Sequence, residues 1–318
     1  MKARLASLTV ASGLFDLRAV CTRAYRGYPP AVASSSPVVA LIPTYRPADS
    51  LVALSARIAA QVDSVVISDD ASPCTFDATL RQAGSLDGVT TIRHQWNRGI
   101  ARGLNDGLSI AREHGAIWLL TVDQDSLVGG SYVAEMVATA NRRVQTGEHL
   151  GALGAGVVAD ASGAITYPLI ESGEQATTHE VIQTGTLWNV TALDRVGGFD
   201  EDLGIDGVDA AACLRLRQAG YRIGVVESTR IDHAIGSSRM MEVAGRKIMV
   251  TGHSPERRSS MLRNRLLLFP EEFRQSPRHA VRTVRRVAVN QLAGLFLEEQ
   301  RWEKTKGSIR GLVPKRTR

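Results

Sequence analysis

Two carboxylates separated by one residue follow a short apolar segment in the first half of the chain. Residues 117–121 are typical of a buried strand in a parallel sheet, and they lead directly into Asp123 and Asp125. Side chains two positions apart on an extended segment point to the same side, so both carboxylates can face one hard cation such as Mg2+ or Mn2+. The sequence therefore predicts a metal site that leaves coordination positions open for phosphate oxygens.

The pattern has an alternative interpretation. Acidic residues often cap the helix that follows a strand, and a bare Asp-x-Asp is expected by chance about once in a chain of this length. Asp200 and Asp202 have the same spacing, but they follow Gly-Gly-Phe rather than a buried strand. The preceding strand, and not the spacing, distinguishes Asp123 and Asp125.

Three other residues could add to this chemistry. Asp206 and Asp209 come just before a helix predicted at 210–219, and capping of that helix is a sufficient explanation for Asp209 taken alone. His233 follows a short strand-like segment. A lone histidine is usually structural, but one that closes a site with two carboxylates is a plausible third metal ligand.

The elements that position these residues begin with four strand–loop–helix units. Their strands are predicted at 38–42, 64–68, 89–93 and 117–121. Such a series predicts an α/β fold with a mostly parallel sheet covered by helices on both faces, and ligands of such sheets collect at the carboxyl ends of the strands. Polar clusters follow all four strands there: residues 44–46, 69–70, 97–98 and 123–125.

The loop after the first strand limits the kind of nucleotide site. This loop reads PTYRP at 43–47 and has no glycine, which argues against a dinucleotide-binding fingerprint. The chain also lacks a P-loop sequence. The remaining possibility is a nucleotide site in which side chains recognise the nucleoside and a metal ion holds the diphosphate.

The second half of the domain is predicted to be smaller and mixed, and to line the acceptor side of the site. It holds a helix at 131–143, a strand at 150–158, an irregular region at 165–178 and a strand at 181–188. Gly185 could allow close approach of a ligand. Trp188 could stack on a sugar, although packing in the core explains a tryptophan there as well.

Composition is that of an ordinary globular protein. The 318 residues are 44% hydrophobic and 22% charged. The three cysteines are far apart and form no C-x-x-C pair, which fits a reducing cytoplasm. No apolar run reaches the roughly 18 residues of a membrane span. Residues 1–36, which end in a Pro/Ala/Ser-rich stretch, are a leader to which no role can be assigned.

Positive charge is concentrated at the C-terminus. The net charge is +6, whereas the residues from Arg274 onward carry twelve Lys/Arg and three Glu. A helix predicted at 277–297 has one mainly apolar face flanked by arginines: Ala280, Val281, Val284, Val287, Ala288, Gln291, Leu292 and Leu295. This face suits docking on an anionic membrane surface, and packing on the protein's own domain explains it equally well.

The order of these motifs resembles that of the family 2 inverting glycosyltransferases of the GT-A fold, most closely the bacterial rhamnosyltransferases. The resemblance covers residues 38–268. The segments that carry it are LIPTYRP at 41–47, SDDAS at 68–72, NRGIARGLNDG at 97–107, TVDQDS at 121–126, VGGFDEDLGIDGVDAAACLR at 196–215, DHAIG at 232–236, and HSPERR with RNR at 253–265.

The resemblance implies roles by position. Thr44, Asp69 and Arg98 would hold the base and ribose of a nucleotide-sugar, with Asp69 accepting from the pyrimidine N–H. Asp123 and Asp125 would bind metal and diphosphate, joined by His233.

Asp209 occupies the position of the family's general base, with Asp206 beside it, and Gly185 and Trp188 lie on the acceptor side. Ala211 stands where family members commonly carry a second acidic residue, and Val208 replaces the glutamate before the base. The bacterial rhamnosyltransferases often share the second departure, whereas Ala211 puts acceptor specificity in doubt.

The activity that this resemblance implies is transfer of L-rhamnose from dTDP-rhamnose to a cell-surface glycan or its polyprenyl-linked precursor. The enzyme would be cytoplasmic or peripheral on the inner face of the cell membrane, and nucleic acid is not expected as a partner. Its domain would divide into a nucleotide-sugar half at 37–126 and an acceptor half at 127–268, followed by a basic helical tail at 269–318. A UDP-sugar donor, for galactofuranosyl or glucosyl transfer, and a non-catalytic nucleotide-binding protein remain as alternatives.

Overall fold

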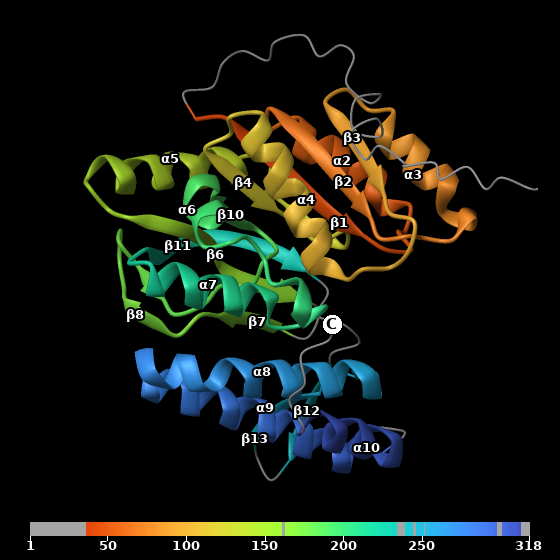
Figure 1. Cartoon of the computed structure of the whole chain (residues 1–318), viewed down its shortest axis with the longest axis vertical. Helices are drawn as coiled ribbons and strands as arrows, with labels where there is room; N and C mark the ends of the chain where they lie inside the picture. The colour runs from red at the N-terminus through yellow and green to blue at the C-terminus, as the bar shows by residue number, and fades with distance from the viewer. Residues whose placement is uncertain are drawn as a thin grey trace, which may run out of the picture. The chain divides into compact units, whose positions relative to one another are not determined.

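The parallel part of the sheet is built from strands whose side chains are buried on both faces. In the computed structural model, β1 (Val38–Thr44), β2 (Ser64–Asp69), β3 (Val89–Arg93) and β4 (Trp118–Thr121) pair in the order β3-β2-β1-β4, all parallel (Figure 1). The structure describes residues 36–160, 163–233, 239–243, 246–250, 252–297 and 301–312. The predicted leader therefore lies, except for Ser36, outside the described residues.

Helices cover both faces of this sheet, as predicted. Alternate residues of β1 point to opposite sides: Ile42 packs with α2 (Ser50–Ala59), α3 (Asp77–Gly84) and α5 (Tyr132–Gln145), while Leu41 packs with the helices on the other side. Those helices are α4 (Ile100–Glu113), α6 (Val190–Arg195) and α7 (Val208–Gln218). The continuous apolar run of β1 thus reflects burial on two sides.

Beyond β4 the sheet becomes mixed. β10 (Thr186–Asn189) is antiparallel to both β4 and β6 (Leu150–Asp160), and β11 (Arg222–His233) runs parallel to β6. The predicted strand at 181–188 is therefore too long, because β10 begins only at Thr186. The predicted irregular region contains three short strands: β7 (Gly163–Thr166), β8 (Leu169–Glu171) and β9 (Thr177–Thr178).

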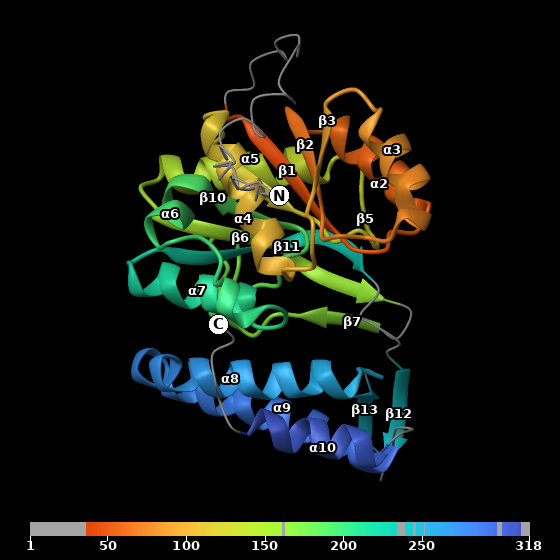
Figure 2. The same ribbon diagram turned by 45° about the vertical axis from the view of Figure 1, so that its right-hand side comes forward.

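Two features of β11 matter for the site. This strand is longer than expected, since the strand-like segment predicted just before His233 is the end of a strand that begins at Arg222 and has a register shift between Val226 and Arg230. Its end pairs antiparallel with β5 (Ser126–Val128), a three-residue strand that the sequence did not predict. Figure 2 shows β5 and β11 from a second direction.

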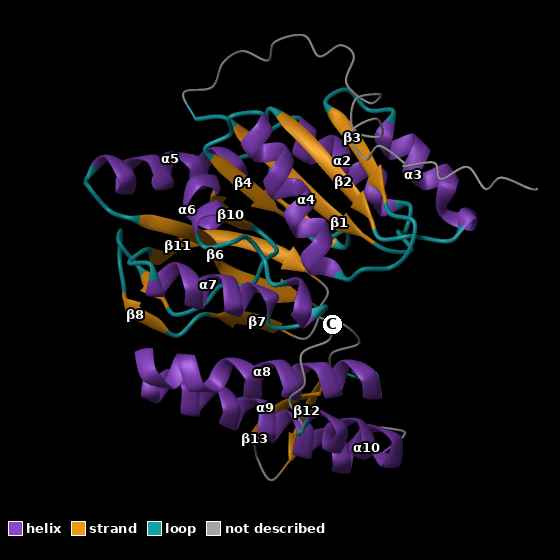
Figure 3. Cartoon of the chain, in the orientation of Figure 1, coloured by secondary structure: helices purple, strands orange, loops and turns teal. Residues whose placement is uncertain are grey.

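The C-terminal part contains a hairpin, β12 (Arg239–Val243) with β13 (Arg246–Val250), and three helices, α8 (Pro255–Gln275), α9 (Pro277–Leu297) and α10 (Arg301–Gly311) (Figure 3). Ser254 caps α8 by accepting a hydrogen bond from the Arg257 N–H at 3.3 Å. The domain boundary proposed at residue 268 lies within α8. Among the described helices, none is long and apolar enough to cross a membrane.

Helix α9 begins and ends near its predicted limits, but its apolar face does not point in one direction. Ala280, Val287 and Gln291 are buried, while Val281 and Leu292 are more than half exposed. Part of the predicted membrane face therefore packs inside the protein.

Candidate active site

The structure brings together the three predicted metal ligands. Asp123, Asp125 and His233 each offer one ligand atom, and these atoms all lie within 4.8 Å of one another. His233 Nε2 is 3.4 Å from Asp123 Oδ2, and His233 Nδ1 is 3.2 Å from Asp125 Oδ1. Residues 110 positions apart in the sequence therefore form one group at the carboxyl end of β4.

Pairing of β5 with β11 creates this group. The register places Ser126 opposite His233, immediately after the two aspartates. Ser126 Oγ lies 3.0 Å from His233 Nδ1 and 2.8 Å from Thr184 Oγ1. The imidazole is thus positioned by a buried hydroxyl beside the carboxylates.

Asp123 is held more tightly than Asp125. Its backbone N–H donates to Thr184 Oγ1 at 2.9 Å, and its carboxylate accepts a hydrogen bond from Gln183 Nε2. Burial, opposed by His233, raises the pKa of Asp123 to about 6, and the charge of Asp125 adds to the rise. A cation at this position would stabilise both carboxylates in their charged form.

The residues present fit a hard divalent cation. Two carboxylates and one imidazole form a mainly oxygen donor set, which suits Mg2+ or Mn2+. Burial alone would lower the pKa of His233, but the hydrogen bond to Asp125 and the charges of both aspartates raise it. Gln183 Oε1, beside Asp123, is a buried acceptor with no hydrogen-bond partner in the described structure. This unsatisfied oxygen would gain a partner from a hydrated cation.

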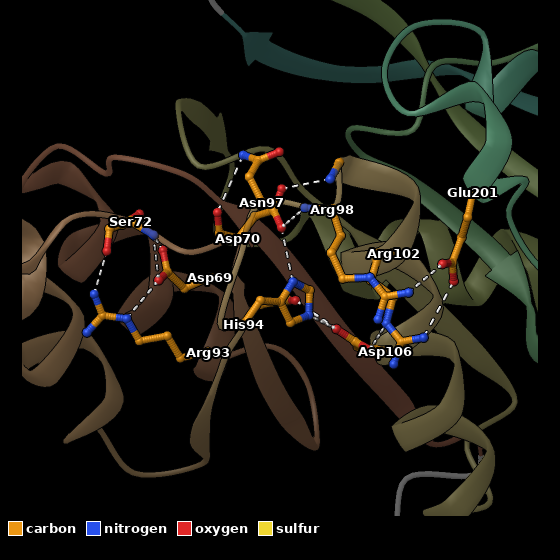
Figure 4. Close-up of polar contacts among 12 residues, drawn as sticks. Asp69, Asp70, Ser72, Arg93, His94, Asn97, Arg98, Arg102, Asp106 and Glu201 are labelled. Carbon is orange, nitrogen blue, oxygen red and sulfur yellow. Dashed lines mark hydrogen bonds and ion pairs between the residues drawn. The ribbon is translucent and has the colours of Figure 1, made fainter. Parts of the chain in front are cut away.

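A second polar network joins the first half of the domain to the loop before α7 (Figure 4). Asp70, at the end of β2, accepts hydrogen bonds from the Arg98 and Gly99 N–H groups at 2.7 and 2.9 Å. A carboxylate there complements the positive end of α4. His94 lies between Asp70 and Asp106, at 3.1 and 2.6 Å. The network therefore fixes the loop that enters α4.

Glu201 extends this network across the domain. Its carboxylate lies 3.4 Å from Arg98 and 3.6 Å from Arg102, and it accepts a hydrogen bond from Asn105 Nδ2 at 3.0 Å. Asn105 also binds both backbone groups of Phe199, at 2.8 and 3.0 Å. Residues 97–107 and 196–201, which were predicted as separate motifs, are thus in direct contact. The Arg98 guanidinium has a protein partner here, and its contact with a nucleotide stays a prediction.

Two residues predicted to contact the nucleotide have partners within the protein, and their contacts with a nucleotide stay predictions. Thr44 is buried, and its hydroxyl donates to the Ile42 carbonyl of its own strand at 3.2 Å. Asp69 is 0% exposed, because its oxygens accept from Ser72 N and Oγ and pair with Arg93 Nε at 3.2 Å. Both side chains stabilise the ends of β1 and β2.

The sequence reasoning missed the residue between the two aspartates. Gln124 accepts from the Tyr45 N–H at 3.1 Å and donates to the Tyr45 carbonyl at 3.0 Å, which ties the loop after β1 to the metal group. The Tyr45 ring is 40% exposed. The available signal for this part of the site was Tyr45, an aromatic residue in the loop just after the first strand, because such a ring can stack on a nucleobase.

Neither residue predicted on the acceptor side is open to a ligand. Trp188 is 0% exposed, packs edge-on against Phe199 and donates from Nε1 to Thr121 Oγ1 at 2.9 Å. Gly185 has a φ of 74°, and a Cβ there would lie 2.8 Å from the Tyr132 hydroxyl and 2.9 Å from Ile231. Tight core packing accounts for both residues, and sugar contacts by either of them stay a prediction.

The predicted base lies at the start of α7. Asp209 is half-buried, and one of its oxygens accepts a hydrogen bond from the Ala210 N–H at 2.8 Å. Burial raises the pKa of Asp209 to about 6, and the nearby charge of Glu180 raises it further, against the Ala210 hydrogen bond and Arg265. A carboxylate with this pKa is a better proton acceptor near neutral pH than an exposed one.

Asp206 shapes the loop before this helix. Its backbone adopts a left-handed φ of 64°, and its side chain pairs with Arg257 at 3.2 Å. Burial raises the pKa of Asp206, and Arg257 opposes the rise. The charge of Arg257 also acts on Asp123 and His233. Arg257 therefore connects the metal group electrostatically with the loop that carries Asp206.

Helix α8 also holds the loop that carries Asp206. It does so through the RNR motif at 263–265, to which no role was assigned from the sequence. Asn264 is buried, and its Nδ2 lies 2.7–2.9 Å from the carbonyl oxygens of Leu203, Ile205 and Asp206. Arg265 pairs with Glu180 at 3.0 Å and Glu272 at 2.9 Å. In the sequence, the only indication of these contacts was the presence of the polar residues Asn264 and Arg265 in a segment that forms a helix.

The α/β fold, with a mostly parallel sheet in its first half and helices at its C-terminal end, is shared with solved structures of the GT-A type. Residues 39–147 match the family described as "Glycosyl transferase family 2". Over this segment the chain matches the family that its motifs resemble, and the fold expected from those motifs is confirmed.

Individual relatives are distant. The chain is 27% identical over 249 residues to "dTDP-rhamnosyl transferase RfbF" of Shigella flexneri, which covers 74% of this chain and 80% of the relative. Among solved structures, S. aureus TarS 1-349 with UDP-GlcNAc is similar, with a TM-score of 0.57 and 17% identity over 87% of this chain and 79% of that one. The chain spans 44% of a longer TarS chain.

A mannosyltransferase from Pyrobaculum calidifontis, PcManGT, in complex with GDP-Man and Mn2+, has a TM-score of 0.53 and 17% identity over 90% of this chain and 84% of that one. At such identities the two solved structures show a shared fold and leave the donor of this chain undefined.

Proposed function

We propose that this protein is an inverting glycosyltransferase that moves L-rhamnose from dTDP-rhamnose to a hydroxyl of a glycan or lipid-linked saccharide. The observation that carries the proposal is the convergence of Asp123, Asp125 and His233 at the carboxyl end of β4. Such a group suits a divalent cation that binds a diphosphate. PcManGT has a solved complex with Mn2+ and a nucleotide-sugar, which supports this choice.

Asp209 is the proposed general base. It would take the proton of the acceptor hydroxyl while the acceptor oxygen forms a bond to the anomeric carbon of the sugar, and the bond from that carbon to the diphosphate oxygen breaks on the opposite face. When bound, a divalent cation would neutralise the charge that develops on the leaving diphosphate. Its ligands would be Asp123, Asp125 and His233.

The nucleoside would lie over the ends of β1 and β2. Tyr45 offers an exposed ring there, and Gln124 fixes its backbone. Buried Thr44 and Asp69 would support this surface from below, and Arg98 would contact the ribose if it exchanged Glu201 for the ligand.

The rhamnosyl donor rests on the distant relative named as a dTDP-rhamnosyl transferase. A UDP-sugar is the second candidate, because TarS has been solved with UDP-GlcNAc. The two candidate donors differ in the nucleobase and the sugar that the site must recognise. They share the divalent cation and the general base, Asp209.

We also propose that the C-terminal helices contact an anionic membrane surface, where a lipid-linked acceptor would reside. Trp302 on α10 is 80% exposed, and Val281 and Leu292 on α9 are exposed, as are the basic side chains Arg278 and Arg285 of the same helix. Exposed aromatic and apolar residues interspersed with arginine are typical of helices that lie in the membrane interface.

The direct test is incubation of the purified protein with dTDP-L-rhamnose, Mn2+ and a panel of saccharide acceptors, with release of dTDP as the signal. The proposal predicts release that depends on Mn2+ and is lost in Asp209→Asn. Release from UDP-sugars alone would keep the enzyme class and replace the donor. Undiminished release by Asp209→Asn would refute the assignment of the base.

A further inference from the structure

A second cavity, distinct from the metal group, lies between the β7–β8 region and helix α9. Its volume is about 460 Å³. Tyr167 and Pro168 form one wall, and one face of α9, carrying His279, Arg282 and Arg286, forms the other. The space is larger than a single phosphate and could also hold an attached sugar.

The cavity carries unbalanced positive charge. Among the described residues that line it, the one carboxylate is that of Glu180, which is already paired with Arg286 at 3.1 Å and with Arg265 at 3.0 Å. Arg282 and Arg285 also line the cavity, and neither has an acidic partner among the residues that the structure describes. Two guanidinium groups are therefore free to bind an oxyanion with charge-assisted hydrogen bonds.

One wall of the cavity reaches the helix that carries the proposed base, because Tyr167 packs against the buried cluster that includes Val208 and Ala211 of α7. Glu180 and Tyr167 are in its wall, and both are close enough to Asp209 for their charges to interact. Tyr167 is also fixed from behind, because its hydroxyl accepts a hydrogen bond from the Ile182 N–H at 3.2 Å. A molecule bound here would therefore extend toward the carboxylate that accepts the proton.

We propose that this cavity binds a phosphate group of the acceptor, so that the acceptor substrate is a phosphate-bearing saccharide. The inference rests on the proposed function, which makes Asp209 the base at the acceptor hydroxyl. Arg282 and Arg285 hold the phosphate, and Tyr167 lines the path from the phosphate to Asp209.

The test is calorimetric titration of the whole protein with inorganic pyrophosphate in EDTA, where the donor site lacks its cation. The double variant Arg282→Ala/Arg285→Ala is compared with Arg274→Ala/Arg278→Ala, which removes the same charge from exposed positions outside the cavity. We expect wild-type binding that weakens about tenfold or more in the cavity variant, since a charge-assisted hydrogen bond contributes roughly 1.5–3 kcal/mol. The control variant should bind within about twofold of the wild type.

Farnesyl diphosphate serves as a second probe. Farnesyl diphosphate could bind more tightly than pyrophosphate, with the same dependence on the two arginines. This result supports the proposal and indicates that the phosphate belongs to a lipid-linked acceptor. If farnesyl diphosphate binds only as tightly as pyrophosphate, the proposal is supported and the phosphate is assigned to the glycan part of the acceptor. No pyrophosphate binding to the wild type, or equal binding to the cavity variant, overturns the proposal.

Failure of the proposed function would give a different result. In that case dTDP and UDP would not bind in the presence of Mn2+, while pyrophosphate in EDTA would still bind in an arginine-dependent way.

Discussion

Ser126 and His233 are partners in the short antiparallel pairing of β5 with β11, and Ser126 Oγ lies 3.0 Å from His233 Nδ1. This contact turns the Nε2 atom of the imidazole toward Asp123, 3.4 Å away. The metal group therefore depends on a strand of three residues as well as on the Asp-x-Asp sequence.

Replacement of Ser126 by Ala should weaken Mn2+ binding roughly tenfold, because residues that orient metal-binding histidines typically contribute 10–100-fold to affinity. The affinity can be measured by titrating Mn2+ into the protein in the presence of dTDP. Ser131→Ala, at an exposed position in the loop after β5, is a control that should bind normally. Unchanged Mn2+ affinity in Ser126→Ala would show that His233 is positioned without this contact.

The pH dependence of transfer should follow Asp209. Because its pKa is raised to about 6 and a base must be deprotonated to act, kcat/KM should fall as the pH drops through about 6. Glu180→Gln removes a negative charge that raises this pKa, so the acidic limb should move to lower pH. Glu171→Gln, at an exposed position on β8, should leave it in place. A limb that stays fixed or moves upward in Glu180→Gln would exclude Asp209 as the titrating group.

Asn264→Ala should destabilise the loop before α7. The amide group lies against three carbonyl oxygens, and buried acceptors left without partners cost about 1–3 kcal/mol. Urea unfolding measures this loss, and kcat should fall more than the affinity for dTDP. Gln275→Ala, exposed in the last turn of α8, should leave both unchanged. Wild-type stability and kcat in Asn264→Ala would argue that the loop is held elsewhere.

The first four strand–helix units could be predicted from the sequence because burial on both faces leaves a continuous apolar run. β3 was predicted with its observed bounds, and β1 was predicted two residues short, since Pro43 and Thr44 still pair in the sheet. The β5 strand has only three residues and carries no periodicity that could be recognised. β11 contains a register shift between Val226 and Arg230, and its last residues were predicted as a separate strand-like segment.

The site was predictable where spacing along one strand decides the geometry, as for Asp123 and Asp125. It was not predictable where tertiary packing decides which way a side chain faces. Trp188 and Asp69 are both buried, although their sequence positions also fit ligand contacts. Contacts such as Arg265 with Glu180 join segments 85 residues apart, and no local pattern records them.

Membrane docking through α9 and α10 predicts binding to vesicles that contain anionic phosphatidylglycerol and little binding to phosphatidylcholine alone. Binding should weaken at high salt, because basic residues near a charged surface contribute about 1 kcal/mol each and are screened. Trp302→Ala should reduce co-sedimentation several-fold, and Trp96→Ala, which removes an exposed tryptophan outside the C-terminal helices, should not. Equal loss in both variants, or no binding to anionic vesicles, would contradict the docking proposal.

The measurement that tests the account most directly is calorimetric titration with dTDP and UDP in Mn2+ and in EDTA, on the wild type, Asp125→Ala and Asp87→Ala. Asp87 is an exposed aspartate in the loop before β3, at the other edge of the sheet. We predict Mn2+-dependent binding that favours dTDP, is lost in Asp125→Ala and persists in Asp87→Ala. Absence of nucleotide binding with Mn2+, or binding by Asp125→Ala that equals the wild type, would contradict the assignment of the active site.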